Sequence, residues 1–125
     1  MNLLLDTHVL LWWLSDDKML GAKARAAIAN PDVQVFVSAA SAWEISIKMT
    51  LGKLDAPENL EEALATSGFT PLPITVDHAL AAGRLPEHHR DPFDRMLIAQ
   101  AQLERLTLVT HDGAFGHYDV GLLDA

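Results

Sequence analysis

The chain has 125 residues, half of them hydrophobic, which is enough to build the core of one compact domain over residues 1–125. It contains no cysteine, so disulfides, thiolate catalysis and thiolate zinc sites are excluded. The formal net charge of −8 disfavours nucleic-acid binding through a broad basic patch, but bound metal would offset acidic ligands. An acidic surface also suits a basic protein, so charge leaves both an RNA and a protein partner open.

Short strands alternate with helices in the first third of the chain. The apolar run at 2–5 predicts a buried strand, and residues 7–14 have helical character. An alanine-rich helix is expected over 21–28, and β-branched residues predict a second strand over 33–37. No apolar run approaches the roughly 20 residues of a membrane span. We expect no signal peptide and a cytoplasmic protein.

The middle of the chain continues this alternation. Residues 38–51 carry apolar side chains four apart and predict a helix that ends at Gly52. A further helix is expected over 58–66. The two prolines of 71–74 confine that short extended segment to a sheet edge or strand end. A helix over 75–83 follows.

The clearest helix signal lies in the last third. Asp91 is its expected N-cap, Pro92 takes the first helical position, and the helix should run to Arg105. Strands are expected over 106–109 and 120–123. Connections this long cannot be hairpins, so the pattern indicates an α/β fold with a mostly parallel sheet of about four or five strands, covered by helices on both faces.

Four acidic residues stand where such a fold places chemistry. Asp6 ends the first strand, Asp112 follows a late strand, and Glu44 and Asp94 lie early in two helices. Ligands of open α/β sheets bind outside the carboxyl ends of the strands, so these side chains can converge. Mg²⁺ and Mn²⁺ prefer carboxylates, waters and phosphate oxygens. The sequence therefore predicts a divalent-metal site that acts on a phosphate compound.

Three of these acids also have a purely structural interpretation. Asp6 can cap the helix that follows it, and Asp112 can be a turn residue before Gly113. Asp94 is the third helical residue after the cap, where its charge favourably meets the helix dipole. Two strand-end acids side by side would nevertheless repel unless a cation or a proton lay between them.

Glu44 is the acid with the strongest structural alternative. It stands three residues after Ser41, in capping-box spacing, and four residues before Lys48, in ion-pair spacing. Taken alone, it is better explained as a capping or surface residue than as a metal ligand.

The histidines give a weaker signal. His88 and His89 are adjacent and project differently, and no cysteine or third histidine at ligand spacing accompanies them, so we assign them to a loop rather than to a metal site. His8 and His111 each flank a predicted ligand and can contact either the ligands or the substrate.

The tryptophans favour packing over substrate binding. We expect Trp12, Trp13 and Trp43 to be core or interface aromatics rather than platforms for base stacking. Three tryptophans and several apolar helix faces in a small chain also predict a two-fold homodimer.

Four motifs in this order resemble those of PIN-domain proteins of the VapC toxin type. They cover nearly the whole chain and are Leu4-Leu5-Asp6-Thr7-His8, the stretch 38–54 with Trp43-Glu44-Ile45, the block 88–101 with Asp91-Pro92-Phe93-Asp94-Arg95, and Thr110-His111-Asp112 followed by Phe115. The resemblance implies a three-layer α/β/α sandwich formed by a single PIN domain. It also implies a Mg²⁺- or Mn²⁺-dependent endoribonuclease, the toxin of a toxin–antitoxin pair.

The resemblance assigns roles to particular residues. The acids that match the family's four catalytic and metal-binding positions are Asp6, Glu44, Asp94 and Asp112. Thr7 and Thr110 match hydroxyl positions behind the metal ligands. The resemblance further implies a homodimer and a cognate antitoxin that places a C-terminal peptide, often with an arginine, in the active-site groove. Water activated by one or two cations would attack the RNA phosphodiester and leave a 5′-phosphate.

Two other function classes fit an acidic cluster. Receiver domains and aspartyl phosphatases need a lysine late in the chain, but none follows Lys53, and the phosphatases need a second aspartate where His8 stands. A non-catalytic PIN-like module that binds RNA or protein remains the alternative, although it would not need all four acids.

Overall fold

The computed structural model describes residues 1–54, 56–57 and 59–125, which form five strands and six α-helices. The strands are β1 (Leu3–Leu5), β2 (Val35–Ser38), β3 (Thr70–Leu72), β4 (Thr107–Thr110) and β5 (Leu122–Asp124). The helices are α1 (Thr7–Leu14), α2 (Ala22–Ala29), α3 (Ala39–Thr50), α4 (Leu60–Thr66), α5 (Val76–Arg84), α6 (Pro92–Glu104) and a short 3₁₀ helix, η1 (Gly113–His117). α-Helices separate the first four strands, as the sequence predicts, and η1, where the sequence indicated only a turn, separates β4 from β5.

The five strands form one parallel sheet in the order β3-β2-β1-β4-β5. β1 lies at its centre, and Leu3, Leu4 and Leu5 have no exposed surface. Side chains alternate across a strand, so Leu3 and Leu5 enter one core cluster and Leu4 enters the other. A strand that is buried on both faces reads as a continuous apolar run, which is why three leucines were enough to predict it.

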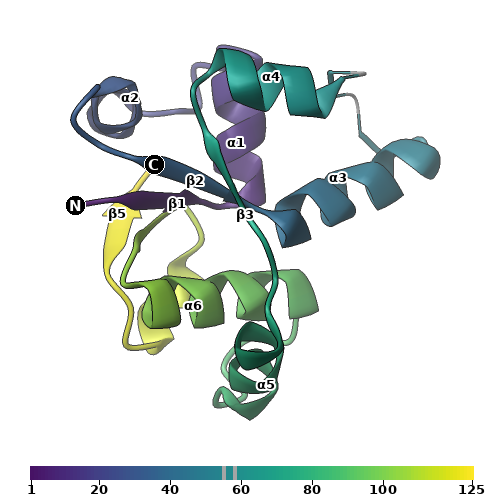
Figure 1. The fold of residues 1–125 in the computed structure, drawn as a ribbon, viewed down its shortest axis with the longest axis vertical. Coiled ribbons are helices and arrows are strands. Elements are labelled where there is room, and N and C mark those ends of the chain that lie inside the picture. The colour runs from purple at the N-terminus through teal and green to yellow at the C-terminus, as the bar shows by residue number, and fades with distance from the viewer. Residues whose placement is uncertain (55, 58) are drawn as a thin grey trace.

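Helices cover both faces of this sheet and give the molecule three layers (Figure 1). One core cluster joins the sheet to α1, α2, α3 and α4, the other joins it to α6, and α5 packs on α6. The predicted α/β/α sandwich is confirmed, with a sheet that is wholly parallel. Burial of each leucine of β1 contributes about 1.5–3 kcal/mol to this arrangement.

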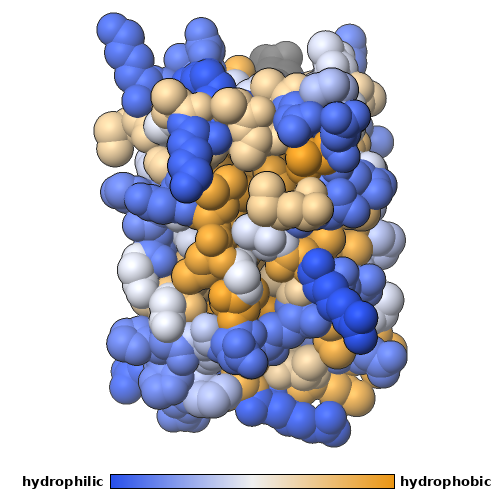
Figure 2. Space-filling model, turned by 90° about the vertical axis from the view of Figure 1, so that its left-hand side faces the viewer, coloured by the Kyte–Doolittle hydropathy of each residue, from blue (hydrophilic) through white to orange (hydrophobic). Residues whose placement is uncertain are grey.

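The amino ends of the strands and their carboxyl ends differ in character. Figure 2 views the side of the molecule where β1 begins, on the left of Figure 1, and hydrophobic residues gather in the middle of that face with hydrophilic residues around them. The polar residues that the sequence singles out lie at the other end of the strands.

The start of α3 differs from the prediction and changes the role of two polar residues. The hydroxyl of Ser38 accepts a hydrogen bond from the Ala40 N–H at 3.0 Å and caps the helix. Ser41 therefore lies inside the helix, and its hydroxyl accepts a hydrogen bond from Thr7 Oγ1 at 3.0 Å instead. The interpretation of Ser41 and Glu44 as a capping box is wrong.

Other boundaries shift by a few residues. β3 forms a sheet edge, as its proline predicts, but it ends at Leu72 and does not reach residue 74. β2 begins at Val35 and β5 at Leu122, each later than the composition indicated. The helix expected over 58–66 is α4, which begins at Leu60; residue 58 lies outside the described residues.

The carboxyl edge of the sheet gathers the predicted site. β1 and β4 are neighbours, so Asp6 after β1 and Asp112 after β4 meet at the same edge. Helices that connect parallel strands start near that edge, which brings Asp94, in the first turn of α6, and Glu44 of α3 to the same place. None of the described helices is long and apolar enough to cross a membrane.

Candidate metal centre

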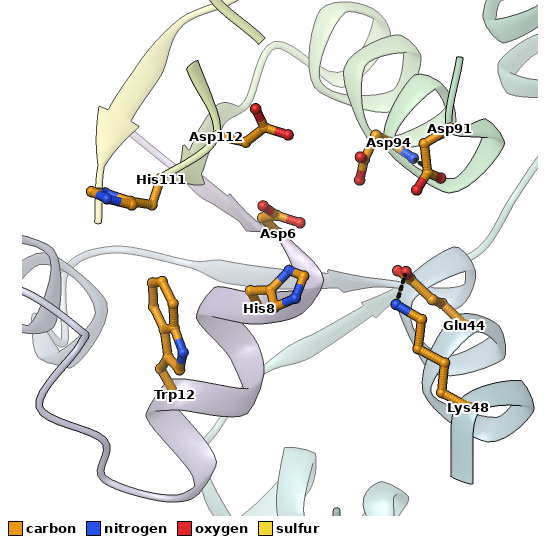
Figure 3. A pocket seen from close by; sticks show the side chains of 9 residues that line it. All are labelled: Asp6, His8, Trp12, Glu44, Lys48, Asp91, Asp94, His111 and Asp112. Carbon is orange, nitrogen blue, oxygen red and sulfur yellow. Dashed lines mark hydrogen bonds and ion pairs between the residues drawn. The ribbon is translucent and has the colours of Figure 1, made fainter. Parts of the chain in front are cut away.

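The four predicted acids line one pocket of about 300 Å³ at the carboxyl edge of the sheet (Figure 3). The side chains that line it are Asp6, His8, Trp12, Glu44, Lys48, Asp91, Asp94, His111 and Asp112. Five of these nine are carboxylates that come from four separate segments of the chain. A cluster of like charges at this density requires protons, cations or both.

Asp6 is held by the neighbouring strand rather than used as a helix cap. The Thr110 hydroxyl donates a hydrogen bond to Asp6 Oδ2 at 2.8 Å and accepts one from the Asp112 N–H at 3.0 Å. The Asp6 carboxylate makes no capping hydrogen bond to α1 within the described part of the chain, so the capping interpretation is wrong. Burial raises the pKa of Asp6, and the Thr110 hydrogen bond opposes that rise.

Glu44 is 5% exposed, and only one of its two carboxylate oxygens has a hydrogen-bond partner among the described residues. Its Oε2 lies 2.9 Å from Lys48 Nζ, which confirms the ion-pair spacing, and this contact raises the pKa of Lys48. Its Oε1 is buried and has no hydrogen-bond partner among the described residues. A buried carboxylate oxygen without a partner costs free energy, so this oxygen is available to a ligand that enters the pocket.

Asp94 carries the strongest electrostatic perturbation of the pocket. Burial, followed by the charges of Asp6, Asp91, Glu44 and Asp112, raises the pKa of Asp94 to about 8. Asp91 acts as the predicted cap, because its Oδ1 accepts hydrogen bonds from the backbone N–H groups of Phe93 at 2.9 Å and Asp94 at 3.3 Å. The Asp94 side chain is thus free of the cap and points into the pocket (Figure 3).

Asp112 has both a structural and a site-facing oxygen. Its Oδ1 accepts a hydrogen bond from the Ala114 N–H at 2.9 Å and caps η1, so the residue begins a 3₁₀ helix rather than a simple turn. Its Oδ2 lies 3.4 Å from His89 Nε2. The side chain is 45% exposed and forms the open side of the cluster.

His89 also faces the acids, although the sequence pattern did not indicate it. Its Nε2 lies 2.9 Å from Asp94 Oδ2, and single atoms of His89, Asp94 and Asp112 all lie within 4.8 Å of one another, close enough for a metal ion. His88 instead stacks on His117. Both histidines lie in the loop between α5 and α6, as the sequence predicts, but only His89 is directed at the acids. The available signal was position: His89 lies two residues before the cap of the helix that carries Asp94.

The tautomer of His89 indicates that it is a hydrogen-bond donor to the site. Its Nδ1 accepts a hydrogen bond from the Asp91 N–H at 3.3 Å, so in the neutral ring the proton is on Nε2. A metal ligand needs a lone pair at that atom. Nε2 is buried, and its N–H makes no well-aligned hydrogen bond within the described ranges. His89 thus offers a donor to the carboxylates or to a phosphate.

The loop that carries His89 is fixed by two side chains. The Tyr118 hydroxyl accepts a hydrogen bond from the His89 N–H at 2.8 Å and donates one to the Pro86 carbonyl at 2.7 Å. Arg95 donates to the carbonyl of His89 and to three others, which belong to Ala82, Leu85 and Pro86. Since the backbone on either side of His89 is held, its ring enters the pocket in a defined orientation.

The fold and the acidic site place the chain in the PIN-domain family, and the sequence pattern of that family, described as the PIN domain, matches residues 3–121. Within the family it belongs to the VapC type. Ribonuclease VapC22 of Mycobacterium tuberculosis is 32% identical to it over 119 residues, which cover 89% of this chain and 87% of that protein.

Two solved structures have the same fold. One is VapBC2 from Rickettsia felis bound to a DNA fragment from its promoter, with a TM-score of 0.74, 15% identity and coverage of 100% of this chain and 99% of that chain. The other is a toxin–antitoxin complex from Klebsiella pneumoniae, with a TM-score of 0.66, 24% identity and coverage of 96% and 94%. The three-layer sandwich of Figure 1 is thus shared over nearly the full length of these chains.

Proposed function

We propose that the protein is a Mg²⁺- or Mn²⁺-dependent endoribonuclease and the toxin of a toxin–antitoxin pair. The name of its relative, Ribonuclease VapC22, and the extent of the match support the ribonuclease assignment. The observation that carries the metal dependence is Glu44 Oε1, a buried carboxylate oxygen that lacks a partner among the described residues, in a pocket of five carboxylates. A single PIN domain over residues 1–125 is the unit that we propose to be active.

The donor set fits a hard cation. Only oxygen atoms are offered by the four acids, and Mg²⁺ and Mn²⁺ prefer carboxylates together with waters and phosphate oxygens. The residues that would hold the cation are Asp6, Glu44, Asp94 and Asp112. The charges that raise the pKa of Asp94 are those that a divalent cation would compensate.

Hydrogen bonds from other groups of the chain orient these carboxylates. In three of the four acids one oxygen is engaged by a hydrogen bond: Asp6 Oδ2 by Thr110, Glu44 Oε2 by Lys48, and Asp112 Oδ1 by the Ala114 N–H. These three carboxylates are therefore oriented before any ligand arrives, which lowers the free-energy cost of assembling the site. When bound, the cation supplies an activated water and offsets the charge of the RNA phosphate.

Partners follow from the relatives and from exposed apolar side chains. The two solved neighbours are complexes of toxins with antitoxins, and we propose a cognate antitoxin for this chain as well.

Val76 and Leu80 lie four apart on α5, 74% and 50% exposed, and Leu103 of the adjoining α6 is 49% exposed. We propose a two-fold homodimer, for which sedimentation at micromolar concentration should show a mass twice that of the monomer.

The test of the catalytic proposal is cleavage of a mixed pool of single-stranded RNA by the purified protein, with Mg²⁺ or Mn²⁺ and with EDTA. We expect cleavage that EDTA stops and that Glu44→Gln loses, because glutamine keeps the contact to Lys48 but cannot offer an anionic oxygen. Glu61→Gln, at a glutamate exposed in the first turn of α4, is the matched control and should cleave normally.

Two results would contradict the proposal. Cleavage by Glu44→Gln at the wild-type rate would remove Glu44 from the site. Binding of RNA by the wild type without cleavage in either metal would favour the non-catalytic module.

A further inference from the structure

The acidic pocket has a second wall that is made of aromatic rings. His8 and Trp12 lie one turn apart on α1, and His111 comes between β4 and Asp112. Figure 3 shows Trp12 and His111 on one side of the pocket, Glu44 and Lys48 on the other, and His8 between them. Metal binding by the four acids does not use these three residues, which we call the aromatic wall.

The rings of the aromatic wall do not stack on one another. The ring centroids of His8 and Trp12 lie 6.4 Å apart with planes at 49°, and those of Trp12 and His111 lie 6.3 Å apart with planes at 63°. The His8–Trp12 pair is tilted and the Trp12–His111 pair is edge-to-face, so none of the three rings is stacked in parallel on another. His8 and His111 are exposed, and His111 is held by a contact of 3.1 Å from Nδ1 to Asp124 Oδ1. The half-buried Trp12 rests against the core and joins the two.

The three tryptophans have different surroundings. Trp13 packs against Phe69 at 5.8 Å, and its Nε1 donates a hydrogen bond to Ser67 Oγ at 3.2 Å, so it belongs to the fold. Trp43 is 62% exposed and meets Phe93 edge-on, outside the residues that line the acidic pocket. Trp12 alone of the three borders that pocket, and it also borders a neighbouring hollow with Leu54.

Three of the nine basic side chains of the chain are engaged by protein groups, and one of these, Lys48, is the basic side chain that lines the acidic pocket. Lys48 is paired with Glu44, Arg25 with Asp16, and Arg95 is engaged with four backbone carbonyls. The net charge of −8 adds a general repulsion of polyanions. Stacking of a base on an aromatic face needs no positive charge and suits any base.

We propose that the aromatic wall binds an unpaired nucleobase of single-stranded RNA beside the phosphate that is cleaved, with Trp12 as the main platform. This inference rests on the proposed function and names its substrate class. The wall and the acids share one pocket, so a base on the wall and a phosphate at the acids belong to the same or adjoining nucleotides. A base inside a duplex keeps its faces covered by its neighbours and cannot stack there.

Steady-state kinetics on a single-stranded RNA oligonucleotide test the platform. Trp12→Leu keeps the apolar bulk against the core but removes the ring face, and should raise KM about 5- to 150-fold, the loss that removal of one base–aromatic stack gives. Trp12→Phe keeps a ring and should recover most of the loss. Trp43→Leu is the matched control and should leave KM unchanged. Equal melting temperatures of the four proteins exclude a folding defect, and an unfolded Trp12→Leu leaves Trp12→Phe and the next measurement to decide.

Tryptophan fluorescence gives a reading that does not need cleavage. The same RNA, added in Mg²⁺, should quench the wild-type emission, and Trp12→Phe should lose that component of the quenching. Its annealed duplex should quench neither protein. If the wild type cuts no RNA but shows quenching that depends on Trp12, the nuclease proposal fails and the aromatic wall stands as an RNA-binding site.

Other outcomes overturn the aromatic wall while the nuclease stands. Cleavage by Trp12→Leu with wild-type KM, together with quenching that is independent of Trp12, would show that no base stacks there. The same variant with normal RNA kinetics but reduced inhibition by the antitoxin would assign Trp12 to a protein contact instead.

Discussion

The buried residue His78 differs from Glu44 and His89 in how its hydrogen-bonding groups are paired. At the contact of α5 with α6, His78 is 2% exposed and both its ring nitrogens have partners: Nδ1 accepts from the Thr75 N–H at 3.1 Å, and Nε2 lies 2.9 Å from Glu104 Oε1. At the carboxyl edge of the sheet, Glu44 Oε1 and His89 Nε2 are buried without well-aligned partners among the described residues.

This difference in hydrogen-bond pairing indicates that His78 stabilises the fold and that Glu44 and His89 are available for function. The paired ring nitrogens of His78 join α5 to α6. Glu44 Oε1, which is unpaired among the described residues, costs free energy and belongs to a side chain that lines a pocket open to a ligand. Gln100 contacts His78 Nδ1 at 3.3 Å, and its Nε2 donates to the Pro73 carbonyl, while its Oε1 is buried without a partner among the described residues. We expect the cluster around His78 to be structural and the acidic pocket to be functional, because only the pocket is open to a ligand.

The largest expected effect is on catalysis at Asp94. Asp94→Asn should lower metal-dependent RNA cleavage by at least about 100-fold, because a lost anionic ligand weakens both the cation site and the charge compensation. Asp91→Asn is the control, since asparagine caps helices about as well as aspartate. Equal rates for Asp94→Asn and the wild type would leave Asp94 as a helix-start residue only.

The next largest effect is a loss of stability when the cluster around His78 is disrupted. His78→Ala should lower the free energy of unfolding by about 2–4 kcal/mol, because it leaves a cavity and leaves the hydrogen-bond partners of both ring nitrogens unpaired. Urea denaturation measures this loss. The variant's response to Mn²⁺ should match that of the wild type; a lost metal response would mean that the two clusters are coupled.

Removal of metal from the wild type should lower its free energy of unfolding by a similar amount. Only the folded state assembles the four acids, so Mn²⁺ at 100 times its dissociation constant should stabilise the fold by about 2.7 kcal/mol. Thermal melts with Mn²⁺ and with EDTA show the shift. Glu44→Gln should lose most of it and Glu61→Gln none of it; an equal midpoint with and without Mn²⁺ in the wild type would contradict a shared site.

His89 should give a smaller effect. His89→Ala removes the donor that faces Asp94 and Asp112 and should weaken metal binding about tenfold, the range seen for groups that orient metal ligands. Calorimetric titration with Mn²⁺ measures the affinity. His88→Ala is the matched neighbour and should bind metal normally; nitrogen NMR of the metal-free protein should show the proton of His89 on Nε2.

The smallest effect concerns the metal-free protein. The folded-state pKa of Asp94 is about 8, whereas an unfolded aspartate titrates near 3.9. This group therefore lowers the stability of the metal-free fold progressively between about pH 4 and pH 8, and the loss is complete above pH 8. Asp94→Asn should therefore melt at a higher temperature than the wild type, by about 1 kcal/mol of stability. The difference should be largest above pH 8 and shrink as the pH falls and Asp94 takes up its proton. A lower melting temperature at pH 8 would contradict this sign.

Local signals in the sequence determined the architecture and the positions of the acids. The leucines of β1 carry a continuous apolar run because the strand is buried on both faces, and the Asp91 cap with Pro92 marks the start of α6. Parallel strands end at one edge, so acids that follow β1 and β4 had to approach one another. These features depend on neighbours along the chain or on the regular geometry of a sheet.

Only the tertiary structure decided how individual side chains are used. Trp12 and Trp13 are adjacent in one helix, but one borders the acidic pocket and the other packs against Phe69. His88 and His89 differ in the same way, because Tyr118 and Arg95, from elsewhere in the chain, fix the loop between α5 and α6. The orientation of a side chain depends on partners that are distant in sequence, and no local pattern records them.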